Sequence, residues 1–359
     1  MNLRLGRFGK QEAAAAVGLG ALIFGVFSLN VGETFARGNV CYAATVAGAL
    51  LGLLSLGLVH GAMGRVGAED LGDLMAGGLS SLFALPLALG LLLSAVLPLF
   101  HFSLAMERYI FVEADYVPIA LYLLAVLLLL VLRGMECIAR MAKLLAVPGT
   151  AALGMTLLLG APAFEMSRLF PLFSPGFSAF IEQTLEALFR FLGPGLALLT
   201  AGRGCQGRGN AMAGVRRGLL LGGAGAALVQ LGLGLTFFGP DMASLSAPVY
   251  CMTMVARQER LGLRLDVLVL FLWVMTGLVA SAFCTYAAAL LLCRIAGAED
   301  VRPVGALLVL QAAGLVLLIN FDSDAVLAVV RLIYRRGYLL LSLPLVPALI
   351  RSLGRRRGA

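Results

Sequence analysis

Ten long apolar stretches follow one another along the chain, and most of the charged residues lie in the short segments between them. Each stretch is close to the roughly 20 residues that an α-helix needs to cross the hydrocarbon core of a bilayer. We therefore predict an all-α polytopic membrane protein with about ten transmembrane helices, in a single domain over residues 1–359. The predicted spans are residues 11–30, 39–62, 79–104, 117–133, 140–160, 183–201, 216–238, 266–293, 303–320 and 337–351.

Composition and charge agree with a membrane protein. Hydrophobic residues make up 61% of the chain and charged residues 13%, whereas soluble domains have about 25% charged residues. The net charge of +8 comes largely from Arg and Lys in segments on the same side of the predicted membrane as the N-terminus, notably between residues 202 and 217. Because basic residues favour the cytoplasmic side, we expect both termini in the cytoplasm and no nucleic-acid binding. We expect no cleavable signal peptide, since the first apolar stretch is long and lacks a convincing cleavage site.

Two of the predicted spans contain residues that interrupt a helix. Gly193, Pro194 and Gly195 lie in the middle of the sixth span, and Gly18 and Gly20 lie in the first. Proline removes a backbone N–H group and clashes with the preceding turn, and glycine leaves helical geometry easily. We therefore predict that helices 1 and 6 are broken inside the bilayer.

The two interrupted spans occupy the same position in the two halves of the chain. Ten spans divide into a first repeat at about residues 11–160 and a second at about 182–351. Because each half has an odd number of spans, the second half enters the membrane from the opposite side, which gives a 5+5 inverted repeat. Broken helices at corresponding positions of such repeats are typical of a substrate site near the membrane midplane.

Backbone groups freed at the two breaks could bind a small zwitterion such as an amino acid. Half-helix N-termini present N–H groups to a carboxylate, and unwound carbonyl groups accept from an ammonium group. The predicted ligand-binding residues are Gly18, Gly20, Ala21, Phe191, Leu192, Gly193, Pro194, Gly195, Ser281 and Thr285. The alternative for the small residues is close packing of helices. We favour packing for Gly25, Gly222, Gly223 and Gly225.

Polar side chains inside the predicted spans have alternative roles. Ser281 and Thr285 share one face of the eighth span, but such hydroxyl groups often bond back to their own helix. Arg190 could pair with Glu186, reach outward or take part in gating. His101 could be a proton-linked switch or a buried structural residue.

No catalytic or metal-binding pattern occurs in the sequence. It has no nucleophile elbow, zinc-protease motif or phosphate-binding loop, so that we do not expect an enzyme. The six cysteines are scattered, without a C-x-x-C pair, and no metal or cofactor is expected. A Cys41–Cys251 disulfide on the outer side remains open.

Two motifs in the chain resemble those of a known family. One is a G-x-E-x-x-A-R pattern at the start of the fifth span, and the other is an R-x-D…W pattern at the start of the eighth. Their residues are Gly134, Glu136, Arg140, Arg264, Asp266 and Trp273. With the order of the motifs, their spacing and the span count, the chain resembles the endospore germination permeases, the GerAB-type B subunit of nutrient germinant receptors.

The resemblance implies a fold, a location and partners. It implies the leucine-transporter-like fold of the amino acid–polyamine–cation superfamily and a multi-pass protein of the spore inner membrane. It also implies that the protein senses a small nutrient, usually an amino acid, together with a larger A-type membrane subunit and a C-type lipoprotein. Glu136 and Arg140 lie four residues apart, which favours a local salt bridge with a structural or subunit-contact role.

We interpret the chain as a nutrient sensor. Its ligand would bind near the midplane between spans one, six and eight and shift the broken helices between two arrangements. The first alternative is a secondary active amino-acid transporter of the same superfamily, although spans one and eight carry no titratable group in their interiors. The second is a structural subunit that binds no ligand.

Overall fold

Helices make up nearly all of the described structure. The computed structural model describes residues 6–27, 40–75, 82–111, 115–170, 176–207, 209–237, 239–242, 245, 247–255, 265–321, 332, 335–342, 345–346 and 350. The α-helices are α1 (Lys10–Val26), α3 (Cys41–Val66), α4 (Leu71–Met75), α5 (Ala84–Tyr109), α6 (Tyr116–Arg133), α7 (Met135–Gly160), α8 (Phe177–Thr200), α9 (Asn210–Thr236), α10 (Gly239–Met242), α11 (Pro248–Val255), α12 (Leu265–Ala296) and α13 (Val301–Phe321). Short 3₁₀ helices are η2 (Ala161–Ala163), η3 (Met166–Leu169) and η4 (Gly202–Gly204).

Seven of the described helices are long and apolar enough to cross a membrane, namely α3, α5, α6, α7, α9, α12 and α13. The protein is therefore an integral, multi-pass membrane protein, as the sequence predicts. The predicted count of ten is not reached within the described residues. Helix α1 has only 17 residues, and α8 carries Glu182, Glu186 and Arg190. The last predicted span, residues 337–351, is described only in part.

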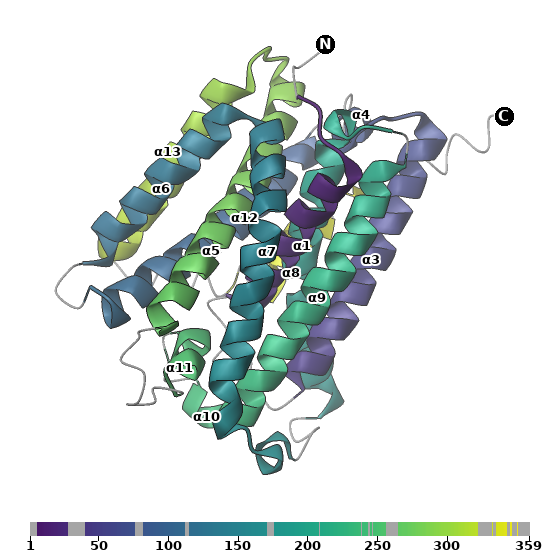
Figure 1. The fold of residues 1–359 in the computed structure, drawn as a ribbon. Coiled ribbons are helices and arrows are strands. Elements are labelled where there is room, and N and C mark those ends of the chain that lie inside the picture. The colour runs from purple at the N-terminus through teal and green to yellow at the C-terminus, as the bar shows by residue number, and fades with distance from the viewer. Residues whose placement is uncertain are drawn as a thin grey trace.

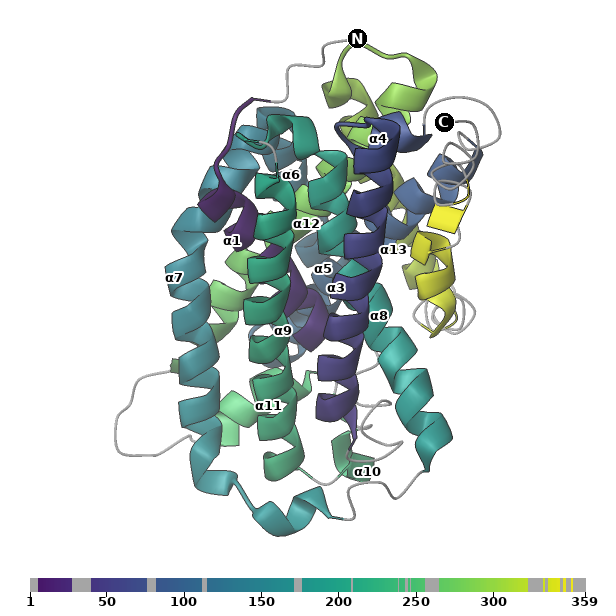
Figure 2. The same cartoon turned by 90° about the vertical axis from the view of Figure 1, so that its right-hand side faces the viewer.

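Helix α1 lies inside the bundle, where it contacts α7, α8, α9 and α12 (Figure 1). It starts near the end of the bundle that carries the N-terminus and stops about midway along it, as two perpendicular views show (Figures 1 and 2). Every residue from Leu19 to Val26 is buried. A helix that is apolar on all sides is typically surrounded by other helices, which explains why this segment occupies the centre.

Helices α1 and α9 approach each other at small residues. A Cβ atom added to Gly222 would lie 2.2 Å from the carbonyl oxygen of Gly18, and one added to Gly218 would lie 2.7 Å from a carbonyl oxygen of α1. One added to Gly25 would lie 2.6 Å from the Cβ atom of Ala226. Small residues let the backbones of membrane helices come into direct contact. The packing role predicted for Gly25 and Gly222 is therefore confirmed.

The glycines predicted to break helices 1 and 6 lie in helix interiors. Helix α1 is continuous through Gly18 and Gly20, and α8 is continuous through Gly193–Gly195. A proline is tolerated in a membrane helix where neighbouring helices surround the backbone groups that it frees, and the second half of α8 is entirely buried. The predicted break positions are thus corrected: α1 ends later, at Val26, and residues 28–39 lie outside the described residues.

Candidate functional site

The Gly193–Gly195 segment lies where α8 meets three other helices. A Cβ atom added to Gly20 in α1 would lie 2.8 Å from the Cβ atom of Pro194. One added to Gly193 would lie 3.0 Å from Oγ of Ser94 in α5, and one added to Gly195 would lie 2.2 Å from Cδ1 of Leu56 in α3. The small residues of this segment therefore bring α1, α3 and α5 against α8, rather than opening the helix.

Helix α12 is tied to the same region through α5. Oγ of Ser281 donates a hydrogen bond to the carbonyl oxygen of Ala95 at 2.7 Å. Thr285, one turn further along α12, is completely buried, and none of the described residues forms a hydrogen bond with its hydroxyl group. Because α12 also contacts α1 and α8, the structure brings together spans one, six and eight, as predicted.

Helix α5 takes part in this junction, although the sequence prediction leaves it out. The side chain of Ser94 in α5 faces Gly193, and the carbonyl oxygen of Ala95 accepts the hydrogen bond from Ser281. The sequence carries a signal for this role, because Ser94 is the single polar residue between Leu82 and Phe100.

Three of the predicted ligand-binding residues form packing contacts. Phe191 and Leu192 are completely buried, and the Phe191 ring lies 3.4 Å from a Cβ atom added to Gly25 in α1. The Cβ atom of Ala21 lies 2.8 Å from one added to Gly222 in α9. These side chains fill the space between α1, α8 and α9.

Helix α1 ends in a buried polar network. The carbonyl oxygen of Gly25 accepts a hydrogen bond from Nε2 of Gln230 in α9 at 2.7 Å and one from Nη1 of Arg190 in α8 at 3.3 Å. Oε1 of Gln230 accepts one from Oγ1 of Thr45 in α3 at 2.5 Å. The last carbonyl groups of a helix have no partner within it, and a cation near them is favoured by the helix dipole. Two neighbouring helices therefore cap α1 with side chains.

Aromatic rings hold the residue that follows α1. The centroid of the Phe27 ring lies 4.7 Å from that of Phe102, 5.0 Å from that of Trp273 and 5.8 Å from that of His101. Nε1 of Trp273 donates a hydrogen bond to Oγ1 of Thr156 in α7 at 3.1 Å. The end of α1 is thus fixed by a polar network from α3, α8 and α9 and by rings from α5 and α12. Any movement of this end must change both sets of contacts.

The G-x-E-x-x-A-R motif joins α6 to α7. Gly134 alone separates the two helices, and its φ of +91° is a conformation that residues with a side chain rarely adopt. Glu136 pairs with Arg140 and accepts a hydrogen bond from the backbone N–H group of Arg7 at 3.2 Å. The predicted local salt bridge is confirmed, and the Glu136 carboxylate also holds the segment that precedes α1.

The second motif lies where α11 contacts α12. Oδ2 of Asp266 accepts a hydrogen bond from the Tyr250 hydroxyl group in α11 at 2.7 Å. Arg264 lies outside the described residues. In the same helix α11, Sγ of Cys251 lies 3.1 Å from the hydroxyl oxygen of Tyr109. Cys41 and Cys251 are both free thiols, so the disulfide that the sequence left open is not formed.

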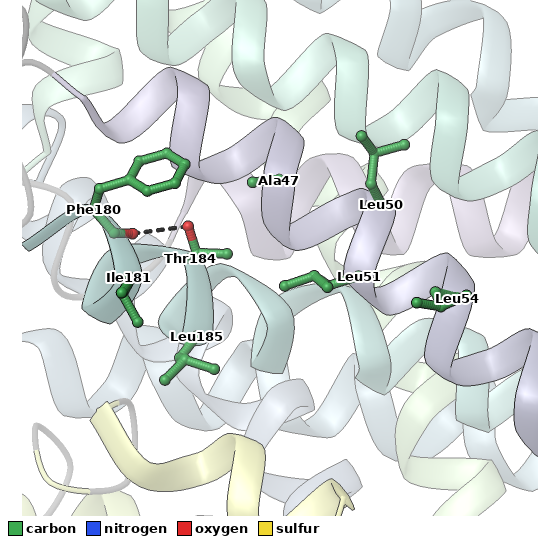
Figure 3. Close-up of a pocket in the computed structure, with 8 residues that line it drawn as sticks. All are labelled: Ala47, Leu50, Leu51, Leu54, Phe180, Ile181, Thr184 and Leu185. Atoms are coloured by element: carbon green, nitrogen blue, oxygen red, sulfur yellow. Dashed lines mark hydrogen bonds between the residues drawn. The ribbon is translucent and has the colours of Figure 1, made fainter. Parts of the chain in front are cut away.

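A groove of about 500 Å³ runs along the outside of the bundle between α3 and α8 (Figure 3). Its lining residues are Ala47, Leu50, Leu51, Leu54, Phe180, Ile181, Thr184 and Leu185. The hydroxyl group of Thr184 donates a hydrogen bond to the carbonyl oxygen of Phe180 at 2.8 Å. The groove therefore offers a hydrocarbon surface, which suits lipid better than a polar solute.

The arrangement of helices is that of secondary transporters. The structure of Mhp1, a nucleobase-cation-symport-1 family transporter with bromovinylhydantoin bound, matches with a TM-score of 0.61 at 14% identity, covering 97% of this chain and 78% of that one. A mutant of the manganese transporter from Eremococcus coleocola matches with a TM-score of 0.60 at 14% identity, covering 96% and 78%. A Na+-coupled sialic acid symporter matches with a TM-score of 0.58 at 12% identity, covering 92% and 78%. The predicted leucine-transporter-like fold is thus confirmed.

The sequence also matches a protein family. The family model described as spore germination protein, the spore permeases, matches residues 48–204. This match confirms the resemblance to germination permeases that the motifs indicate. None of the curated proteins compared with the chain matches it. The family model and the fold are both those of permease-type membrane proteins.

Proposed function

We propose that the protein is the nutrient-sensing B-type subunit of a spore germinant receptor, and that it binds a small solute, an amino acid, beside the end of α1. The family match and the transporter-type fold support a permease-type role. The transporters of similar fold bind small solutes, since their structures are described with bromovinylhydantoin or as a substrate-bound sialic acid symporter.

The observation that carries this proposal is the end of α1 inside the bundle. Gly25 is held there by side chains of Gln230 and Arg190, whose hydrogen bonds can be exchanged for bonds to a ligand without unfolding a helix. A solute that binds one position of α1 more tightly than another shifts the equilibrium by that difference in affinity. The residues that we propose to line the site once α1 has shifted are Gly20, Ser94, Gly193, Ser281 and Thr285.

We further propose a membrane orientation and partners. Arg140, Lys143 and Arg203 lie at the end of the bundle where α1 starts, which supports a cytoplasmic N-terminus. The receptor would lie in the spore inner membrane with an A-type membrane subunit and a C-type lipoprotein. Purification of the tagged protein from spore membranes tests this: both subunits are expected to be recovered with it, and recovery of neither would contradict the assignment.

A secondary transporter is the second candidate function, because the fold matches transporters over nearly the whole chain. One reconstituted sample separates the two functions. The sensor is expected to show saturable heat stabilisation by one class of amino acid, by about 2.7 kcal/mol at 100 times the Kd, with uptake of the labelled amino acid no faster than into empty vesicles. Accumulation that depends on the protein would favour the transporter. If no amino acid stabilises the protein against heat, the ligand-binding proposal is contradicted.

A further inference from the structure

Five charged side chains form an ion-pair cluster at the end of the bundle where α1 starts. We call them the end cluster: Glu69, Asp70, Asp73, Arg203 and Arg294. They come from three separate segments, namely α4 with the residue pair before it, the η4 segment after α8, and the last turn of α12. Both views place α4 at this end (Figures 1 and 2). No part of the proposed nutrient site uses these residues.

Arg203 connects the segment after α8 to α4. Its Nη2 atom donates to Oδ1 and Oδ2 of Asp73 at 2.7 Å each. Its Nε atom lies 3.3 Å from Oδ2 of Asp70 and 3.3 Å from Oε2 of Glu69. A Cβ atom added to Gly202 would lie 3.1 Å from the carbonyl oxygen of Glu69, so the two backbones also approach closely.

Arg294 connects the end of α12 to the same helix. Its Nη1 atom lies 2.9 Å from Oδ1 of Asp73, and its Nη2 atom lies 2.5 Å from Oδ2 of Asp70. Oδ1 of Asp70 accepts a hydrogen bond from the N–H group of Asp73 at 2.9 Å, which fixes the carboxyl group over the first turn of α4. The Arg294 side chain passes against Gly72, because a Cβ atom added there would lie 2.9 Å from its Cδ atom.

The end cluster has three carboxyl groups and two guanidinium groups. Its net charge is therefore −1 when all five groups are ionised, and one bound proton makes it neutral. Asp70 is the most buried of the three acids: its side chain is 0% exposed, compared with 26% for Asp73 and 71% for Glu69. Burial raises the pKa of Asp70 to about 6, against the opposing charges of Arg294 and Arg203. Burial also raises the pKa of Asp73, but the hydrogen bond and charge of Arg203 outweigh it and leave that pKa below its usual value.

These pKa shifts determine whether a fall in pH favours the closed or the open cluster. The described groups that face Asp70 are Glu69 and Asp73 on its own segment, Arg203 after α8 and Arg294 on α12. If the segments separate, Asp70 meets water and returns to a pKa near 4. Between about pH 4 and about pH 6, Asp70 is therefore protonated in the closed cluster and ionised in the open one. Closure is favoured as the pH falls through 6, because the closed cluster binds more protons. Asp73 has the opposite effect, which sets in only at lower pH.

We propose that the end cluster is a proton-sensitive latch, which ties α4 to the ends of α8 and α12 in one state of the bundle and releases them in another. The segment that carries Arg203 also holds the chain before α1, since Phe8 accepts from Gln206 N–H at 2.9 Å and donates to the Gly204 carbonyl oxygen at 3.0 Å. Opening of the latch therefore loosens the start of α1. This regulation goes beyond nutrient sensing and needs no ligand.

The residue before Arg294 carries a native thiol, which we expect to become accessible when the end of α12 is released. Cys293 is completely buried and its Sγ atom lies 3.5 Å from the carbonyl oxygen of Asp300. In a variant that keeps Cys293 and has serine at the other five cysteines, maleimide labelling of the ligand-free protein in membranes is measured relative to the denatured protein at the same pH. The labelled fraction is expected to rise several-fold between about pH 5 and about pH 8, because Asp70 loses its proton in that range.

Three variants distinguish a proton-sensitive latch from a cluster whose role is purely structural. Asp70→Asn is expected to keep labelling low at both pH values, and Arg203→Gln to raise it at both. Arg140→Gln, which removes the exposed pair with Glu136 at the same end, serves as the control and should behave like the wild type. Labelling of the wild type that does not depend on pH, or Asp70→Asn labelling that rises with pH as in the wild type, would overturn the latch. Either result leaves the nutrient proposal untouched, since no ligand is present.

Discussion

The Gly222→Leu variant is expected to lose most of its folded protein, because α1 and α9 are in backbone contact at this position. A Cβ atom at Gly222 would already lie 2.2 Å from the carbonyl oxygen of Gly18 and 2.8 Å from the Cβ atom of Ala21. Neither neighbour can rotate away. Overpacking of a core costs about 1–3 kcal/mol and occasionally more, a large part of the about 5–15 kcal/mol that stabilises a folded protein. The measurement is the yield of monodisperse protein and its Tm in detergent.

Gly154→Leu in α7 is the matched control. No heavy atom lies within 4 Å of a Cβ atom added to Gly154, so leucine there has room. Leucine also forms helix better than glycine, by up to about 1 kcal/mol. This variant is expected to match or exceed the Tm of the wild type. An equal loss of folded protein in both variants would mean that the α1–α9 contact is not the reason.

Gln230→Leu is expected to abolish the response to nutrient while the protein still folds. The change removes the donor to the Gly25 carbonyl oxygen and the acceptor for Thr45. A buried polar group that loses its partner costs about 1–3 kcal/mol, which shifts an equilibrium between two positions of α1 by a factor of about 5 to about 160 without unfolding the bundle. The measurements are the germination response of spores and the stabilisation of the purified protein by the amino acid.

Thr236→Val on the same helix is the control for Gln230→Leu. Its hydroxyl group is also buried, but it donates to the Gly232 carbonyl oxygen of its own helix at 2.8 Å, so its loss affects no other helix. A normal response is expected. If Gln230→Leu germinates as the wild type does, the polar network has no part in sensing.

Much of the fold could be predicted from the sequence. The apolar stretches predict a multi-pass helical protein, because each helix must satisfy its backbone groups within itself in lipid. The Glu136–Arg140 pair follows from local spacing, and the packing of Gly25 and Gly222 follows from the lack of a side chain. Such contacts depend on residues that lie one turn apart or on side-chain size, and the sequence displays both.

The position of the helix breaks could not be predicted in this way. Gly193–Gly195 has the composition of a break, yet α8 continues through it because α1, α3 and α5 pack against its small residues. The capping of α1 by Gln230, whose side chain also accepts a hydrogen bond from Thr45, could not be predicted either. Gln230 is the single polar residue between Arg217 and Thr236, and only the three-dimensional arrangement shows that its side chain meets the carbonyl group of Gly25.

Trp273 provides the most direct test of ligand-driven movement at the end of α1. It is the only tryptophan of the chain. The centroid of its ring lies 5.0 Å from that of Phe27, the residue that follows α1. We predict that the amino acid which stabilises the purified protein against heat also changes the fluorescence of Trp273, with the same saturation curve. Stabilisation by an amino acid with no change in this fluorescence would contradict the claim that the ligand acts on the end of α1.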